Sequence, residues 1–147
     1  MSGIKDIIVN RLENSPFTYE DLIEMIHDSV RERVDQNLLF NVSRMSSDDF
    51  RNKTQNGIVL VAFRNTDLLG TVCIHFYDDR EGRHYAYHEH VFVRPESKRD
   101  GIGSLLYRCV VDLSQRNYCE YILSDTAIDA TSSVKWHKKN GFIIVGL

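Results

Sequence analysis

Two basic residues and two glycines, Lys98, Arg99, Gly101 and Gly103, stand close together in the stretch SKRDGIGSLL. The first turn of a helix offers unpaired backbone N–H groups and a partial positive charge, and glycine lets an anion approach such a backbone closely. If a helix begins here, this stretch could bind a phosphate group. The same residues also suit a purely structural turn, and two glycines alone do not separate these readings.

Apolar residues beyond Gly101 follow the spacing of one helical face. They are Ile102, Leu105, Leu106, Cys109, Val110 and Leu113. The preceding stretch, 85–93, is rich in β-branched and aromatic residues and predicts a strand. The order is therefore strand, basic loop and helix. Neither a GxxxxGK[ST] loop nor a dinucleotide fingerprint is present, because Leu106 stands where the fingerprint needs its third glycine.

The rest of the chain predicts the element order β-α-α-β-β-β-α-β-α-β. A capping-box pattern at Thr18 and Asp21 begins the first helix, and Ser46 caps a second, short helix that ends near 56–57. The predicted strands cover 4–9, 58–63, 68–77, 84–93, 120–124 and 142–145, and the last helix covers 131–139. Three antiparallel strands followed by two strand–helix units indicate an α+β fold with a mixed sheet.

Length and composition favour one soluble domain, 1–147. The chain has 147 residues, 42% of them hydrophobic and 27% charged, with a formal net charge of −3. This charge gives no reason to expect nucleic acid or an anionic membrane as a partner. Three cysteines without CxxC spacing, an acidic N-terminal region and no long apolar run lead us to expect a cytoplasmic protein without a signal peptide or membrane span.

With this order and loop established, the chain resembles the GCN5-related N-acetyltransferase (GNAT) family. The resemblance is sharpest over residues 89–106, and a second match is the sequence WHKKNGF at 136–142. It implies a fold whose central strands splay apart and a binding site for acetyl-CoA. The residues implied in acetyl-CoA binding are Phe92, Val93, Lys98, Arg99, Asp100, Gly101, Ile102, Gly103 and Ser104. In the family, the loop and helix start bind the pyrophosphate, and the pantetheine arm pairs with the backbone of the preceding strand.

The resemblance also assigns the chemistry. Glu89 matches a family glutamate that serves as general base, and strand alternation would place it on one face with Tyr85, Tyr87, Val91 and Val93. His137 stands where the family usually has a tyrosine that protonates the departing thiolate, a role that imidazolium can also fill. The resemblance implies that the backbone N–H of Val93 stabilises the oxyanion.

Both catalytic assignments have structural alternatives. Glu89 could be a solvent-exposed or ion-paired strand residue, and His137 could be a surface histidine of an amphipathic helix.

Three departures from the family pattern affect these expectations. Asp100 lies inside the loop, where it could weaken pyrophosphate binding or cap the helix. Arg99 replaces a common glycine of the family. The sequence given ends soon after the strand predicted at 142–145, so we expect that the family's seventh strand is absent, is cut off from this sequence, or is supplied by a partner in a homodimer.

A metal site on the strand at 84–93 is not expected. His84, His88 and His90 are too spread along one strand to bind a metal without help from another strand.

These observations predict direct transfer of an acetyl group from acetyl-CoA to a primary amine. No cysteine occupies a motif position, so a covalent acetyl-enzyme is not expected. A small-molecule acceptor is the first hypothesis. A peptide or protein amine is the second, and a non-catalytic acyl-CoA-binding module on the same fold is the third.

Overall fold

The computed structural model describes residues 6–35, 45–125 and 131–143, without the side chains of 32–35, 98, 99 and 131–134. Its strands are β1 (Ile8–Arg11), β2 (Ile58–Arg64), β3 (Asp67–Asp78), β4 (His84–Val93) and β5 (Tyr121–Ser124). Its α-helices are α1 (Tyr19–Asp35), α3 (Ser47–Thr54), α4 (Ile102–Arg116) and α5 (Thr131–Lys139), with short 3-10 helices at Leu12–Asn14 (η2) and Pro95–Asp100 (η3).

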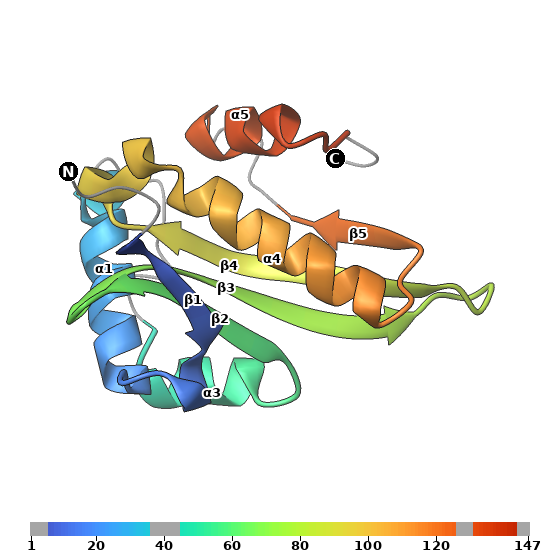
Figure 1. The fold of residues 1–147 in the computed structure, drawn as a ribbon, viewed down its shortest axis with the longest axis horizontal. Coiled ribbons are helices and arrows are strands. Elements are labelled where there is room, and N and C mark those ends of the chain that lie inside the picture. Colours follow the sequence, from blue (N-terminus) through green and yellow to red (C-terminus); the bar gives the residue numbers. More distant parts are fainter. Residues whose placement is uncertain (1–5, 36–44, 126–130, 144–147) are drawn as a thin grey trace.

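The strands form one mixed sheet in the order β1-β2-β3-β4-β5. Neighbours β1 to β4 are antiparallel, and β5 runs parallel to β4. Helices cover both faces: α4 crosses one, and α1 and α3 lie against the other (Figure 1). The predicted α+β class and mixed sheet are therefore confirmed.

Alternation along β2 and β3 divides the core into two layers. Val59, Val61 and Cys73 face the α1 and α3 side, where Phe50 and Leu22 are fully buried. The intervening strand residues face α4, whose buried stripe is Ile102, Leu106 and Val110. The sequence pattern predicts these three residues, and two more predicted members, Cys109 and Leu113, are partly buried against them. Leu105, which was also predicted, is only half-buried.

Both predicted helix starts are confirmed. Thr18 and Asp21 exchange hydrogen bonds: the Thr18 N–H donates to the Asp21 carboxylate, and the Asp21 N–H donates to the Thr18 hydroxyl. Ser46 and Asp49 form the same capping box at α3. These reciprocal bonds satisfy N–H groups that have no partner within the helix.

Element boundaries differ from the predictions mainly at the ends of the chain. The first strand is Ile8–Arg11 rather than 4–9, and residues 1–5 lie outside the described residues. Phe142 and Ile143 form no strand, and the remainder of the predicted last strand is outside the described part. No helix in the described ranges is both long and apolar enough to span a membrane.

Candidate active site

A β-bulge in β4 decides how the candidate site is arranged. Cys73 of β3 pairs with Glu89, whereas Thr71, two residues earlier, pairs with Phe92, so β4 carries one extra residue between these pairs. The backbone of His90 takes up this residue with φ at 55°, in the left-handed region. The face that each side chain occupies therefore changes at His90.

The bulge corrects the predicted face of Glu89. Strict alternation put Val91 and Val93 on its face, but both pack in the layer beside α4. His90 lies instead on the face of Glu89: its Nε2 is 3.6 Å from Glu89 Oε1, and its ring packs against Phe50. The prediction fails here because the extra residue shifts the two-residue period by one.

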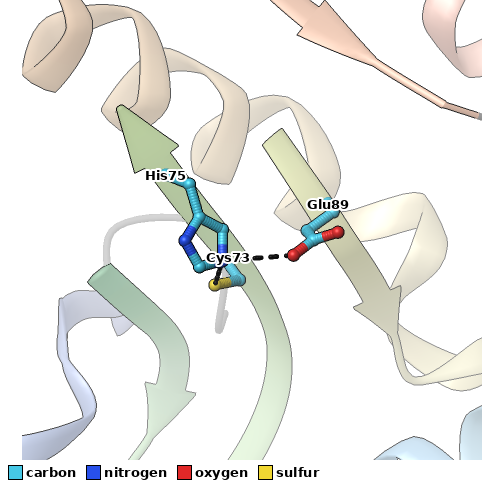
Figure 2. A group of neighbouring side chains, drawn as sticks. All are labelled: Cys73, His75 and Glu89. Carbon is cyan, nitrogen blue, oxygen red and sulfur yellow. Dashed lines mark hydrogen bonds and ion pairs between the residues drawn. The ribbon is translucent and has the colours of Figure 1, made fainter. Parts of the chain in front are cut away.

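Three polar side chains of β3 and β4 meet at Glu89 (Figure 2). His75 Nε2 is 3.2 Å from Glu89 Oε1 and 3.5 Å from Cys73 Sγ. Burial and the charge of Glu89 raise the pKa of the Cys73 thiol to about 12. Sequence reasoning missed Cys73 and His75, although their spacing of two along a strand puts them on one face.

The strands β4 and β5 part beside this cluster. Their parallel pairing runs from Tyr85 with Tyr121 to His88 with Ser124, where β5 ends. Residues 89–93 of β4 have no further pairing with β5 within the described ranges. This end of the pairing agrees with the splay that the family resemblance predicted at this position.

The α4 helix begins next to this opening. Gly101 precedes it with φ at 76°, and no side chain of the described residues caps it, so Asp100 does not have the capping role that was one alternative. Asp100 is exposed and lines a depression of about 750 Å³ with Arg94 and Glu96. Ile102 is buried in the core, so only its backbone can meet a ligand. The side chains of Lys98 and Arg99 lie outside the described part.

Half-buried aromatic side chains surround the buried His88 on the α4 face of the sheet. His88 contacts the rings of Tyr107, Trp136, His137 and Phe142. Both ring nitrogens of His88 and the indole N–H of Trp136 are buried, and none of them has a hydrogen-bond partner among the described residues. Burial, with a smaller contribution from His137, lowers the pKa of His88 to about 4, so this imidazole is neutral near pH 7.

His137 is held at the end of β5. Its Nε2 is 2.8 Å from the hydroxyl of Ser124. It contacts His88, which alternates with Glu89 along β4, so His137 and Glu89 lie on opposite faces of the sheet. The two predicted catalytic residues therefore lie on opposite faces of the sheet, each next to the last pair of β4 and β5, His88 and Ser124.

The three histidines of β4 do not converge. His84 bonds Asp78 at 2.8 Å and stacks on Phe76, His88 faces α4, and His90 faces α3. Their rings therefore occupy three separate environments.

These features are compatible with acetyl-CoA. Residues 89–93 of β4 have no pairing with β5 in the described part of the chain, the uncapped start of α4 offers N–H groups to an anion, and buried nitrogens of His88 and Trp136 lack partners among the described residues on the α4 face. A ligand that carries both a phosphate and amide groups matches these donors.

Comparison with known proteins agrees with this geometry. The family model described as the acetyltransferase (GNAT) family matches residues 18–142. No curated protein matches the sequence.

Solved structures extend the likeness to nearly the whole chain. A transcriptional regulator from Bacillus halodurans has a TM-score of 0.74 and 19% identity, covering 96% of this chain and 95% of that chain. A predicted acetyltransferase from Clostridium acetobutylicum, solved with acetyl-CoA, has a TM-score of 0.67 and 16% identity, covering 95% and 91%. Glucosamine-6-phosphate N-acetyltransferase from Arabidopsis thaliana has a TM-score of 0.62 and 13% identity, covering 96% and 94%. At these identities the structures show the shared fold, and the family match shows that the chain belongs to the GNAT family of N-acetyltransferases.

Proposed function

We propose that this chain transfers an acetyl group from acetyl-CoA directly to the primary amine of a small molecule, while both substrates are bound. The observation that carries the proposal is the parting of β4 from β5 beside the uncapped start of α4. The Clostridium acetobutylicum relative that holds acetyl-CoA supports this choice of acetyl donor.

The start of α4 would hold the pyrophosphate. Backbone N–H groups of residues 101–104 point along the helix axis toward an anion, and each such interaction contributes about 0.3–1 kcal/mol when exposed. Lys98 and Arg99 add positive charge in the sequence just before this helix. The backbone at Phe92 and Val93, beyond the last pairing with β5, would bind the pantetheine arm.

Glu89 is proposed as the general base. An alkylammonium has a pKa of about 10.4, so the acceptor must lose a proton before its nitrogen can attack at pH 7. The Glu89 side chain is 30% exposed, so its carboxylate is open to an acceptor on one side while it contacts His75 on the other. The bound acetyl-CoA supplies the thioester, and Glu89 takes the proton from the acceptor amine, directly or through a water.

His137 is proposed as the acid. It approaches the opening from the face opposite to Glu89, where it would donate a proton to the departing thiolate. The amine nitrogen adds to the carbonyl carbon to form the C–N bond, and the C–S bond then breaks. The ammonium gives up two protons in all, the first through Glu89 and the second to solvent after the attack, while His137 gives one proton to the thiolate and regains it from solvent, so that one proton is released overall. The Val93 N–H is the proposed donor to the carbonyl oxygen.

A small acceptor is favoured because the carboxylate of Glu89 lies among covered side chains. His90 lies 3.6 Å from its Oε1 and itself packs on the buried Phe50, so an amine reaches the carboxylate on a slender chain or a small ring more readily than on a folded protein surface. The fold relative that acts on glucosamine-6-phosphate offers one class of acceptor for trial, an amino sugar.

Two measurements test the proposal in order. Acetyl-CoA at 100 times its Kd should stabilise the protein by about 2.7 kcal/mol, which raises the Tm by several degrees. CoA release should then be measured against a panel of amino sugars, polyamines, aminoglycosides and lysine peptides. No stabilisation would remove acetyl-CoA as the donor. Stabilisation without turnover of any amine would favour the non-catalytic module, and turnover of peptides alone would favour the peptide alternative.

A further inference from the structure

Cys73, His75 and Glu89 bring three different ligand atoms to one point between β3 and β4 (Figure 2). The Cys73 thiol, the His75 Nε2 and a Glu89 carboxylate oxygen all lie within 4.8 Å of one another. They come from two strands because Cys73 pairs directly with Glu89, and His75 follows on the same face of β3. The register of the sheet therefore builds the cluster.

Hydrogen bonds alone cannot pair all three polar atoms of this cluster with one another. A histidine that relays a proton uses its two ring nitrogens for two partners. Here the same nitrogen, Nε2 of His75, faces both the thiol and the carboxylate. In a neutral imidazole, Nε2 either carries a hydrogen and donates it to Glu89, or carries none and accepts the thiol hydrogen of Cys73. It cannot do both, so only one of the two contacts can be a hydrogen bond. A cation between the three atoms would satisfy all of them at once.

Two of the three distances match the edges of a tetrahedral zinc site. Zinc binds thiolate sulfur at about 2.3 Å and imidazole nitrogen at about 2.0–2.1 Å, so ligand atoms at tetrahedral angles lie about 3.3–3.6 Å apart. The observed separations are 3.5 Å from Cys73 Sγ to His75 Nε2 and 3.2 Å from His75 Nε2 to Glu89 Oε1. The third pair, Cys73 Sγ and the Glu89 oxygen, lies within 4.8 Å, so a rotation of the partly exposed Glu89 side chain would complete the site.

Burial gives the cluster one closed side and one open side. Cys73 is fully buried and His75 is 7% exposed, whereas the side chain of Glu89 is 30% exposed. Low polarity around the first two atoms strengthens their interaction with a cation. The exposed side of Glu89 leaves a route for the ion and room for a water as a fourth ligand.

His90 supplies an outer partner. Its strained backbone at the bulge turns its ring to this face, and its Nε2 lies 3.6 Å from the Glu89 oxygen that faces His75. Metal-binding carboxylates are commonly held by such neighbours, which orient them. A non-glycine residue at positive φ costs free energy, so the strain is consistent with a functional demand at this position.

We propose that Cys73, His75 and Glu89 form a binding site for Zn²⁺ or a similar divalent transition metal, with water as the fourth ligand and His90 orienting the carboxylate. Sulfur and nitrogen ligands select zinc and its neighbours over magnesium and calcium. On binding, Cys73 releases its thiol proton to solvent and no electron is transferred. Because the metal would coordinate the Glu89 carboxylate, it should inhibit acetyl transfer reversibly. This inhibition rests on the proposed function, whereas metal binding does not.

Cobalt binding to the full chain, reduced and stripped of metal by a chelator, tests the site. One Co²⁺ should bind per chain, with a thiolate-to-cobalt charge-transfer band in the near ultraviolet, and Zn²⁺ should displace it. Cys73→Ser should abolish the band and weaken binding by about 100-fold or more, since a first ligand matters at least as much as an outer one. His90→Asn, which tolerates the backbone angle, should keep the band and weaken binding by about 10–100-fold.

Two further variants serve as a control and as a substitute for Cys73→Ser in the cobalt-binding experiment. Cys109→Ser removes a half-buried thiol of α4, outside the cluster, and should leave the band and the affinity unchanged. If Cys73→Ser fails to fold, Glu89→Gln at the partly exposed position should still weaken cobalt binding by about tenfold or more. Absence of saturable binding, or a charge-transfer band that survives Cys73→Ser, would overturn the site. These outcomes are read without acetyl-CoA, so they are independent of whether the chain acetylates an amine.

Discussion

Trp136 packs directly on Gly103, so that a Cβ built on residue 103 would lie 2.7 Å from the indole Nε1. This contact joins the two sequence motifs of the family, the glycine loop at the start of α4 and WHKKNGF on α5. The contact with Trp136 alone therefore disfavours any larger residue at position 103, whether or not a ligand also binds there. The α5 helix is positioned over the first turn of α4 through this close contact (Figure 1).

Gly103→Ala should destabilise the protein. The added methyl group must displace the indole, and overpacking of this kind costs about 1–3 kcal/mol. Thermal unfolding would measure the loss as a fall in Tm. In Trp136→Phe the indole nitrogen is gone, so the same Gly103→Ala change should cost less, with a coupling of about 0.5–3 kcal/mol between the two sites. Equal costs in both backgrounds would contradict the contact.

The sequence predicts the elements of this fold well because their signals are local. The capping boxes at Thr18 and Ser46 and the apolar stripe of α4 each depend on residues within a few positions of one another. The hairpin of β2 and β3 has the same character. Such patterns reflect backbone geometry directly, without knowledge of the tertiary structure.

The site is less predictable because it depends on register. The bulge at His90 depends on how β4 pairs with β3, and no residue pattern in β4 predicts it. The cluster at Glu89 likewise needs the pairing of Cys73 with Glu89. The 3-10 helix at Pro95–Asp100 replaced a loop that was predicted without regular structure. Each of these features is a tertiary outcome that local propensity does not encode.

His88 should make stability depend on pH below neutrality. Its pKa is lowered by burial from 6.5 to about 4, so between these values the unfolded chain binds a proton that the folded chain does not. The stability associated with neutral His88 is complete above pH about 6.5 and is lost as the pH falls toward about 4. The loss is about 3 kcal/mol, measurable by urea unfolding at a series of pH values.

His88→Leu should remove much of this slope and should cost little stability at pH 7, because the described residues give neither ring nitrogen a hydrogen bond to lose. The matched control is His84→Gln, on the same strand but partly exposed, which should keep the slope. A slope that persists unchanged in His88→Leu would assign the pH dependence to other groups.

Glu89→Gln should lower kcat by about 10²-fold or more if Glu89 is the base, because the amide cannot accept the amine proton. The assay should contain a chelator, so that loss of a bound metal does not affect the rate. Stabilisation by acetyl-CoA should be unchanged, since Glu89 is not among the residues proposed to bind it. Glu120→Gln, an exposed carboxylate just before β5, is the control that should keep full activity. An unchanged rate in Glu89→Gln would exclude Glu89 as the base.

His137→Phe should lower kcat by about 10²-fold while leaving the stabilisation by acetyl-CoA intact, because phenylalanine fills the aromatic packing but cannot donate a proton. Ser124→Ala tests whether the hydrogen bond to Ser124 orients the imidazole. It should lower kcat less than His137→Phe, because the imidazole remains but the hydroxyl no longer holds its Nε2. Acyl donors whose thiols are more acidic leave more readily as thiolates, so transfer from them should be less sensitive to His137→Phe. If both variants retained the parent kcat, the hydrogen bond between His137 and Ser124 would be structural, and the proton for the leaving group would come from solvent.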